Sequence, residues 1–102
     1  MAISITITQK NSAITNYHVT GNVFYGLDGK FYIPILSYVN HQSYLAQADY
    51  PVEKSTCDIT SFLLTLSPNP QNGQTFADYL RSSIETYLIT NEDVFKNGHL
   101  VD

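Results

Sequence analysis

The 102-residue chain contains no tryptophan, one cysteine and only five basic residues, and each shortage excludes a class of protein. A single cysteine, Cys57, cannot form an internal disulfide, which argues against a disulfide-stabilised secreted scaffold. The five basic side chains are scattered, so no segment follows a phosphate backbone or an anionic membrane surface. No apolar run approaches the ~20 residues that span a bilayer. We therefore expect no direct nucleic-acid contact and no membrane contact.

Motifs for catalysis and metal binding are also missing. None of the three histidines, His18, His41 and His99, lies within four residues of another His, a Cys or a Glu. The five glycines form no phosphate-binding loop, and no serine lies in a Gly-x-Ser-x-Gly context. A lone cysteine is more often a small buried hydrophobe than a nucleophile. We predict a protein that is not an enzyme, with no metal site and no cofactor.

Uncharged polar residues and tyrosine take the place of the missing charge. Charged residues make up 14% of the chain, against roughly 25% in typical soluble domains. Hydrophobic residues make up 43%, which is enough for a core, and the length suits a single domain over residues 1–102. Threonine and the eight tyrosines favour half-buried strands, and surfaces rich in Tyr, Ser and Asn suit stable protein contacts.

The hydrophobic pattern predicts an α+β fold, in which a mainly antiparallel sheet carries one amphipathic C-terminal helix on a face. Residues 3–8 alternate apolar and polar side chains, which indicates a half-buried strand. Residues 57–66 are predicted to be a buried strand and residues 67–73 a loop, whereas residues 40–56 receive no assignment.

The helix is predicted over residues 75–89. Thr75 and Asp78 resemble a capping box at its start, and apolar residues recur along it at helical spacing. Arg81 and Glu85 lie four residues apart, so we expect a weak ion pair on the helix surface.

Asp28-Gly29 lies between two β-rich segments and predicts a hairpin with a two-residue turn. This register places Tyr25 opposite Tyr32, and it sorts the side chains onto two faces. One face carries the candidate interface residues Tyr17, Val19, Tyr25, Tyr32, Leu36 and Tyr38. The other carries Phe24, Phe31, Ile33 and Ile35. Both faces are apolar, although a hairpin on a core usually leaves one face to water. Pro34 lacks an N–H, so its strand should be an edge or contain a bulge.

Three interpretations of the Tyr-rich face remain open. The helix at 75–89 covers it within the monomer, a second protein covers it, or it is a stacking platform for a carbohydrate or peptide. A platform for single-stranded nucleic acid would need neighbouring basic residues, and only Lys30 is near.

The opening segment MAISITITQKNSAITNYHVTGNVFY, with its Thr-, Asn- and Tyr-rich strands, resembles small structural proteins of tailed-bacteriophage virions. That resemblance implies a capsid-decoration, connector or tail component present in many copies. Residues 1–6 lack the basic and apolar regions of a signal peptide, so we expect synthesis in a cytoplasm. The resemblance implies that this is a host cytoplasm and that the protein then resides in a virion.

Our leading hypothesis is therefore a non-enzymatic structural protein that assembles with copies of itself or with other subunits. The first alternative is a small binding module that uses the Tyr-rich face for a carbohydrate or peptide, and the second is a hydrolase with a dispersed site.

Overall fold

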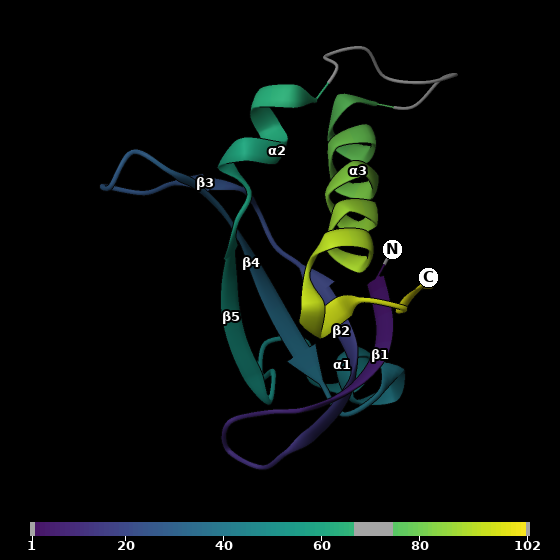
Figure 1. The fold of residues 1–102 in the computed structure, drawn as a ribbon. Helices are drawn as coiled ribbons and strands as arrows, with labels where there is room; N and C mark the ends of the chain where they lie inside the picture. Colours follow the sequence, from purple (N-terminus) through teal and green to yellow (C-terminus); the bar gives the residue numbers. More distant parts are fainter. Residues whose placement is uncertain (1, 67–74, 102) are drawn as a thin grey trace.

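Six antiparallel strands form one sheet in the computed structural model, which describes residues 2–66 and 75–101 (Figure 1). The strands are β1 (Ala2–Thr8), β2 (Ile14–Thr20), β3 (Phe24–Tyr25), β4 (Phe31–Tyr38), β5 (Glu53–Asp58) and β6 (His99–Val101). The helices are α1 (His41–Ala46), α2 (Thr60–Thr65) and α3 (Phe76–Asn91), followed by the 3-10 turn η1 (Asp93–Phe95). The predicted α+β class is confirmed. The loop predicted at 67–73 lies outside the described residues.

The strand order is β3–β4–β2–β1–β6, and β5 also pairs with β4. Ile35 of β4 pairs with Thr20 of β2 and with Ser55 of β5, so β2 and β5 lie on opposite edges of β4. Tyr32 pairs with Phe24 of β3 and also with β5, which places β3 on the same edge of β4 as β2. The segment 14–25 therefore runs along one edge of β4 as two strands with a break between them.

The helix α3 packs against one face of the sheet, as its apolar stripe predicts. Ile84 and Leu88 of α3 are buried together with isoleucines of β1 and β4. The helix begins after Thr75, whose side chain accepts a hydrogen bond from the Asp78 N–H at 3.1 Å. The predicted cap is therefore confirmed, and the helix extends two residues beyond its predicted end.

The Tyr-rich face has a different cover from the one that the sequence predicts. The short helix α1, and not α3, packs beside Tyr17 and Tyr38, which are 6% and 1% exposed. Tyr44 of α1 lies 5.3 Å from the Tyr17 ring and 5.1 Å from the Tyr38 ring, measured between centroids. The interpretation in which the helix at 75–89 covers this face is therefore wrong, because α3 occupies the isoleucine face.

The predicted hairpin register is wrong, and it is wrong in two steps. The Gly26 N–H donates to the Lys30 carbonyl and Gly29 has φ +83°, so three residues form the turn and Gly29 takes the left-handed conformation. Tyr25 consequently pairs with Phe31 instead of Tyr32. A one-residue shift moves every side chain to the opposite face, so Tyr25 leaves the face that carries Tyr32.

A second irregularity, between β2 and β3, shifts the register by one more residue. Val19 now pairs with Leu36 and Tyr17 with Tyr38, so these four side chains share a face as predicted. The break lies beside Pro34, whose carbonyl accepts the Gly21 N–H on that edge of β4. Pro34 has no N–H to donate there, which is the physical reason that β2 does not continue. The strand β4 is not an edge strand, but its neighbour is interrupted as the proline requires.

Two further predictions are corrected by the tertiary structure. Residues 57–66 are not one buried strand, because β5 ends at Asp58 and α2 begins at Thr60. The Asp58 side chain accepts the Thr60 N–H at 2.9 Å, which turns the chain at this point. The prediction of an ion pair between Arg81 and Glu85 on the helix surface is also wrong, since the Glu85 side chain is completely buried.

Candidate functional site

The structure separates the six candidate interface residues into a buried and an accessible group. Tyr17 and Tyr38 belong to the monomer's second core, with Val19 and Leu36 half-buried against it. Tyr32 is half-buried beside Phe24, with ring centroids 5.6 Å apart. Tyr25 alone of the six is mostly exposed, at 66%. The surface available for contact is therefore the distal part of the hairpin and not the whole Tyr-rich face.

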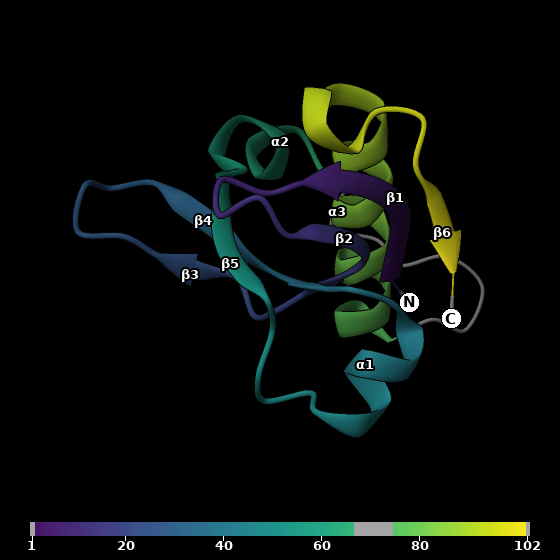
Figure 2. The ribbon, with the colours of Figure 1, turned by 90° about the horizontal axis from the view of Figure 1, so that it is seen from below.

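This distal part, residues 24–32, projects from the body of the molecule and is called the arm below (Figures 1 and 2). Phe24 is 45% exposed, Tyr25 66% and Leu27, at the tip of the turn, 110%. Three large apolar side chains close together on a projecting two-stranded ribbon are unusual on a surface that water alone covers.

The charged side chains of the arm, Asp28 and Lys30, interact with other residues of the same molecule. The Tyr32 hydroxyl donates to the Asp28 carboxylate, and this bond lowers the pKa of Asp28. The Lys30 N–H donates to the same carboxylate at 3.1 Å, while the Lys30 ammonium lies 3.9 Å from the carboxylate of Asp58. The carboxylate at the turn is thus anchored toward the strands, and the Leu27 side chain forms the outermost apolar group.

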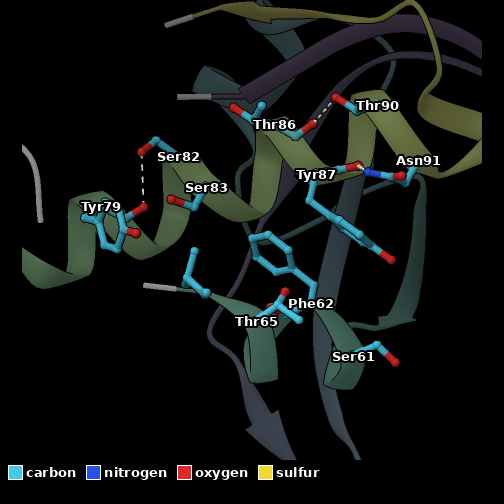
Figure 3. Close-up of a pocket in the computed structure, with 11 residues that line it drawn as sticks. Ser61, Phe62, Thr65, Tyr79, Ser82, Ser83, Thr86, Tyr87, Thr90 and Asn91 are labelled. Carbon is cyan, nitrogen blue, oxygen red and sulfur yellow. Dashed lines mark hydrogen bonds between the residues drawn. The ribbon is translucent and has the colours of Figure 1, made fainter. Parts of the chain in front are cut away.

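A groove with a volume of about 720 Å³ lies between α2 and α3 (Figure 3). Its apolar floor is the stacked pair Phe62 and Tyr87, whose ring centroids are 4.6 Å apart. The remaining lining side chains are Ser61, Thr65, Leu66, Tyr79, Ser82, Ser83, Thr86, Thr90 and Asn91. None of the lining residues carries a charge at neutral pH.

Several polar side chains at the rim of the groove donate hydrogen bonds to backbone carbonyls of their own helices. The Thr90 hydroxyl donates to the Thr86 carbonyl at 2.7 Å, and the Asn91 amide donates to the Tyr87 carbonyl at 3.2 Å (Figure 3). The Thr65 hydroxyl donates in the same way to the Phe62 carbonyl at 2.9 Å. Hydroxyl oxygens that have donated their proton keep acceptor lone pairs. The hydroxyl oxygens at the rim can therefore accept hydrogen bonds from a bound molecule.

The sequence pattern does not predict this groove, although it contains one signal for it. Ser82, Ser83, Thr86 and Thr90 recur at helical spacing and give α3 an uncharged hydroxyl face beside its apolar stripe. The pattern predicts a strand at Phe62, so it does not place Phe62 opposite Tyr87.

Both ring nitrogens of His18 are hydrogen-bonded within the protein. Its buried ring donates from Nε2 to the Ile5 carbonyl, where the β1–β2 register is irregular, and accepts the Ser37 hydroxyl at Nδ1, both at 2.8 Å. Burial lowers the pKa of this imidazole, and the bond to Ile5 opposes that shift. Across residues 2–66 and 75–101, no group of three or more His, Cys, Asp or Glu side chains is placed to hold a metal ion.

Cys57 is half-buried on β5, and burial raises the pKa of its thiol to about 11. A thiol with so high a pKa is a weak nucleophile at neutral pH. In the part of the chain that the structure describes, no helix has the length and apolar character to cross a membrane.

Comparison with protein-family models, with curated proteins and with solved structures finds no match for this chain.

Proposed function

We propose that this protein is a non-enzymatic structural subunit that joins copies of itself or other subunits of a larger assembly through its arm. The supporting observation is the projection of Phe24, Tyr25 and Leu27 on a two-stranded ribbon away from the body of the fold. An exposed ribbon of this kind gains stability when its apolar side chains pack on another surface.

The size of the arm determines how strong one contact can be. Given 150–250 Å² per aromatic side chain, the three exposed side chains offer on the order of 300 Å² of surface. Burying that area is worth about 7 kcal/mol at 25 cal/mol per Å², which lies within the ~4–15 kcal/mol cost of association. A single arm contact is therefore weak, and it suits an assembly with many copies, where repeated contacts act together.

A virion component of a tailed phage fits this proposal. The support is the Thr-, Asn- and Tyr-rich composition with few charges, together with the resemblance of residues 1–25 to small virion proteins. Such a subunit needs neither an active site nor a cofactor. The alternative function, a binding module for a carbohydrate or peptide, places its ligand on the Tyr-rich face, where α1 already packs on Tyr17 and Tyr38.

Sedimentation velocity over a hundredfold range of protein concentration tests the proposal. The wild-type average sedimentation coefficient should rise with concentration, whereas the double variant Tyr25→Ser, Leu27→Asp should remain a monomer. Leu45→Asp is the matched control, because Leu45 is 67% exposed but lies on α1, outside the arm. A wild-type protein that stays monomeric at every concentration and binds no subunit encoded beside it would refute the proposed function.

A further inference from the structure

We propose that the open edge of β5 pairs with the same edge of a second copy, as antiparallel strands about a two-fold axis at Thr56. Among the described strands, β5 bonds to β4 alone. It lies at the margin of the sheet, and α1 and α3 lie to its other side (Figures 1 and 2). The inference rests on the proposed function, because the arms bring copies together and the edge then adds a second contact.

The backbone of β4 shows which residues of β5 form this open edge. The Pro34 carbonyl accepts the Gly21 N–H, so the backbone groups of Pro34 point away from β5. In an antiparallel pair the opposite residue then points its own backbone groups outward, and that residue is Thr56. Because this direction alternates along a strand, the backbone groups of Lys54 and Asp58 also point outward. All three outward residues are exposed.

A two-fold axis at Thr56 uses every one of these groups. It sets Thr56 opposite Thr56 of the second copy, and Lys54 opposite Asp58, with each pair exchanging both backbone hydrogen bonds. The oppositely charged side chains then share a face with their Cβ atoms about 5 Å apart. A shift of two residues leaves Asp58 without a basic residue opposite, and parallel pairing places Lys54 beside Lys54. Charge therefore selects the two-fold register.

The charged residues of the edge favour pairing with a second copy instead of preventing it. A lysine on an edge strand usually blocks contact with another strand, but here a carboxylate faces Lys54 across the pair. Hydrogen bonds from Thr60 lower the pKa of Asp58, and the Lys30 ammonium lies 3.9 Å from the same carboxylate. The Lys54 N–H exchanges an exposed 3.1 Å bond to the Glu53 side chain for one to the second copy.

The edge contact is too small to hold two copies together by itself. The strand β5 contributes six residues, whereas a stable interface takes ~20–30 residues from each partner. Copies that are already joined through their arms meet at a much higher effective concentration, so a weak second contact can form between them. The arm extends past the Asp58 end of β5 and leaves the edge itself free.

Disulfide trapping tests the pairing and its register. Ser55 would lie opposite Cys57 of the second copy in a pair without backbone hydrogen bonds, whose Cα atoms are ~4.5 Å apart. That distance permits a disulfide. Ser55→Cys should therefore form a covalent dimer under mild oxidation, read on a non-reducing gel. Ser61→Cys, an exposed change on α2, is the control and should form about tenfold less dimer, since no thiol faces it.

Charge reversal gives a second measurement, which needs no oxidation. Lys54→Glu places a carboxylate opposite Asp58 at both ends of the pairing, so it should raise the dissociation constant for assembly about tenfold. Lys10→Glu makes the same change at an exposed position away from β5 and should leave the dissociation constant unchanged. Sedimentation velocity measures both variants, and circular dichroism checks that both fold.

The outcomes separate the edge contact from the proposed function. If the arm double variant is monomeric while Ser55→Cys gives no more dimer than Ser61→Cys, the inference is wrong and the proposed function stands. A Lys54→Glu protein that assembles like the wild type also overturns the inference. If Ser55→Cys forms equal amounts of dimer with and without the arm substitutions, the edges pair without the arm, and the proposed function loses its support.

Discussion

Replacing Glu85 by methionine should stabilise the protein. Glu85 lies in α3 with none of its side chain exposed, and neither carboxylate oxygen has a hydrogen-bond partner among residues 2–66 and 75–101. Burial raises the pKa of this carboxyl, and positive charges that include Arg81 oppose the shift. Methionine has an unbranched chain of similar length and no group that needs a hydrogen bond, so Glu85→Met removes the polar atoms and keeps most of the packing.

The magnitude follows from the missing partners. A buried polar group without a hydrogen bond costs about 1–3 kcal/mol in proteins. Glu85→Met should therefore raise the free energy of unfolding by about 2 kcal/mol at pH 7. At roughly 4–8 °C per kcal/mol for a domain of this size, the melting temperature should rise by about 10 °C.

The stability gained by Glu85→Met should be larger at high pH than at low pH. The folded-state pKa of Glu85 is raised above its unfolded value, so the folded protein binds the extra proton in the interval between the two. The contribution of Glu85 to the wild-type free energy of unfolding therefore increases as the pH falls from the folded-state pKa toward the unfolded-state pKa, which is near 4.3. The advantage of Glu85→Met should shrink over the same interval.

Urea denaturation at pH 7.5 and pH 5.0 measures both effects. Glu85→Gln should gain less than Glu85→Met, because it removes the charge but keeps polar atoms. Asp49→Asn, at an exposed position, is the control and should leave stability within about 0.5 kcal/mol of wild type. A Glu85→Met protein that is less stable than wild type by the same amount at both pH values would show that the carboxylate has a stabilising partner.

Two further predictions concern buried titratable groups. The lowered pKa of His18 means that the unfolded chain takes up a proton near pH 6.5 while the folded protein does not, so stability should fall below pH 6.5 by at most ~1.4 kcal/mol per pH unit. Urea denaturation of Glu85→Met between pH 7.5 and 5.5 isolates this effect, and an NMR titration midpoint for His18 at or above 6.5 would contradict it. The Cys57 thiol, with a pKa of about 11, should react with iodoacetamide at pH 7.5 at least tenfold more slowly in the folded protein than in urea, and equal rates would exclude the assigned burial.

Features that depend on residues close together along the chain could be predicted from the amino-acid sequence. The alternation over residues 3–8 lies in β1, because successive side chains of a strand point to opposite faces. Thr75 and Asp78 start α3 because a capping bond joins residues three apart. These local patterns, with the length of the chain, were enough for the α+β class. The shared face of Tyr17, Val19, Leu36 and Tyr38 agrees with the prediction although the register does not, because two one-residue shifts add to two residues and a two-residue shift keeps side chains on the same face.

Which surfaces remain exposed depends on contacts between segments that are far apart along the chain. A turn of three residues instead of two moved Tyr25 to the opposite face of the ribbon from Tyr32, and neither turn length is excluded by Asp28-Gly29 alone. Glu85 occupies a position that looks exposed on a helical wheel, yet it is buried by elements distant in the sequence. The groove likewise exists only because α2 brings Phe62 onto Tyr87. Burial is a property of contacts between distant segments, so periodicity along one segment cannot determine it.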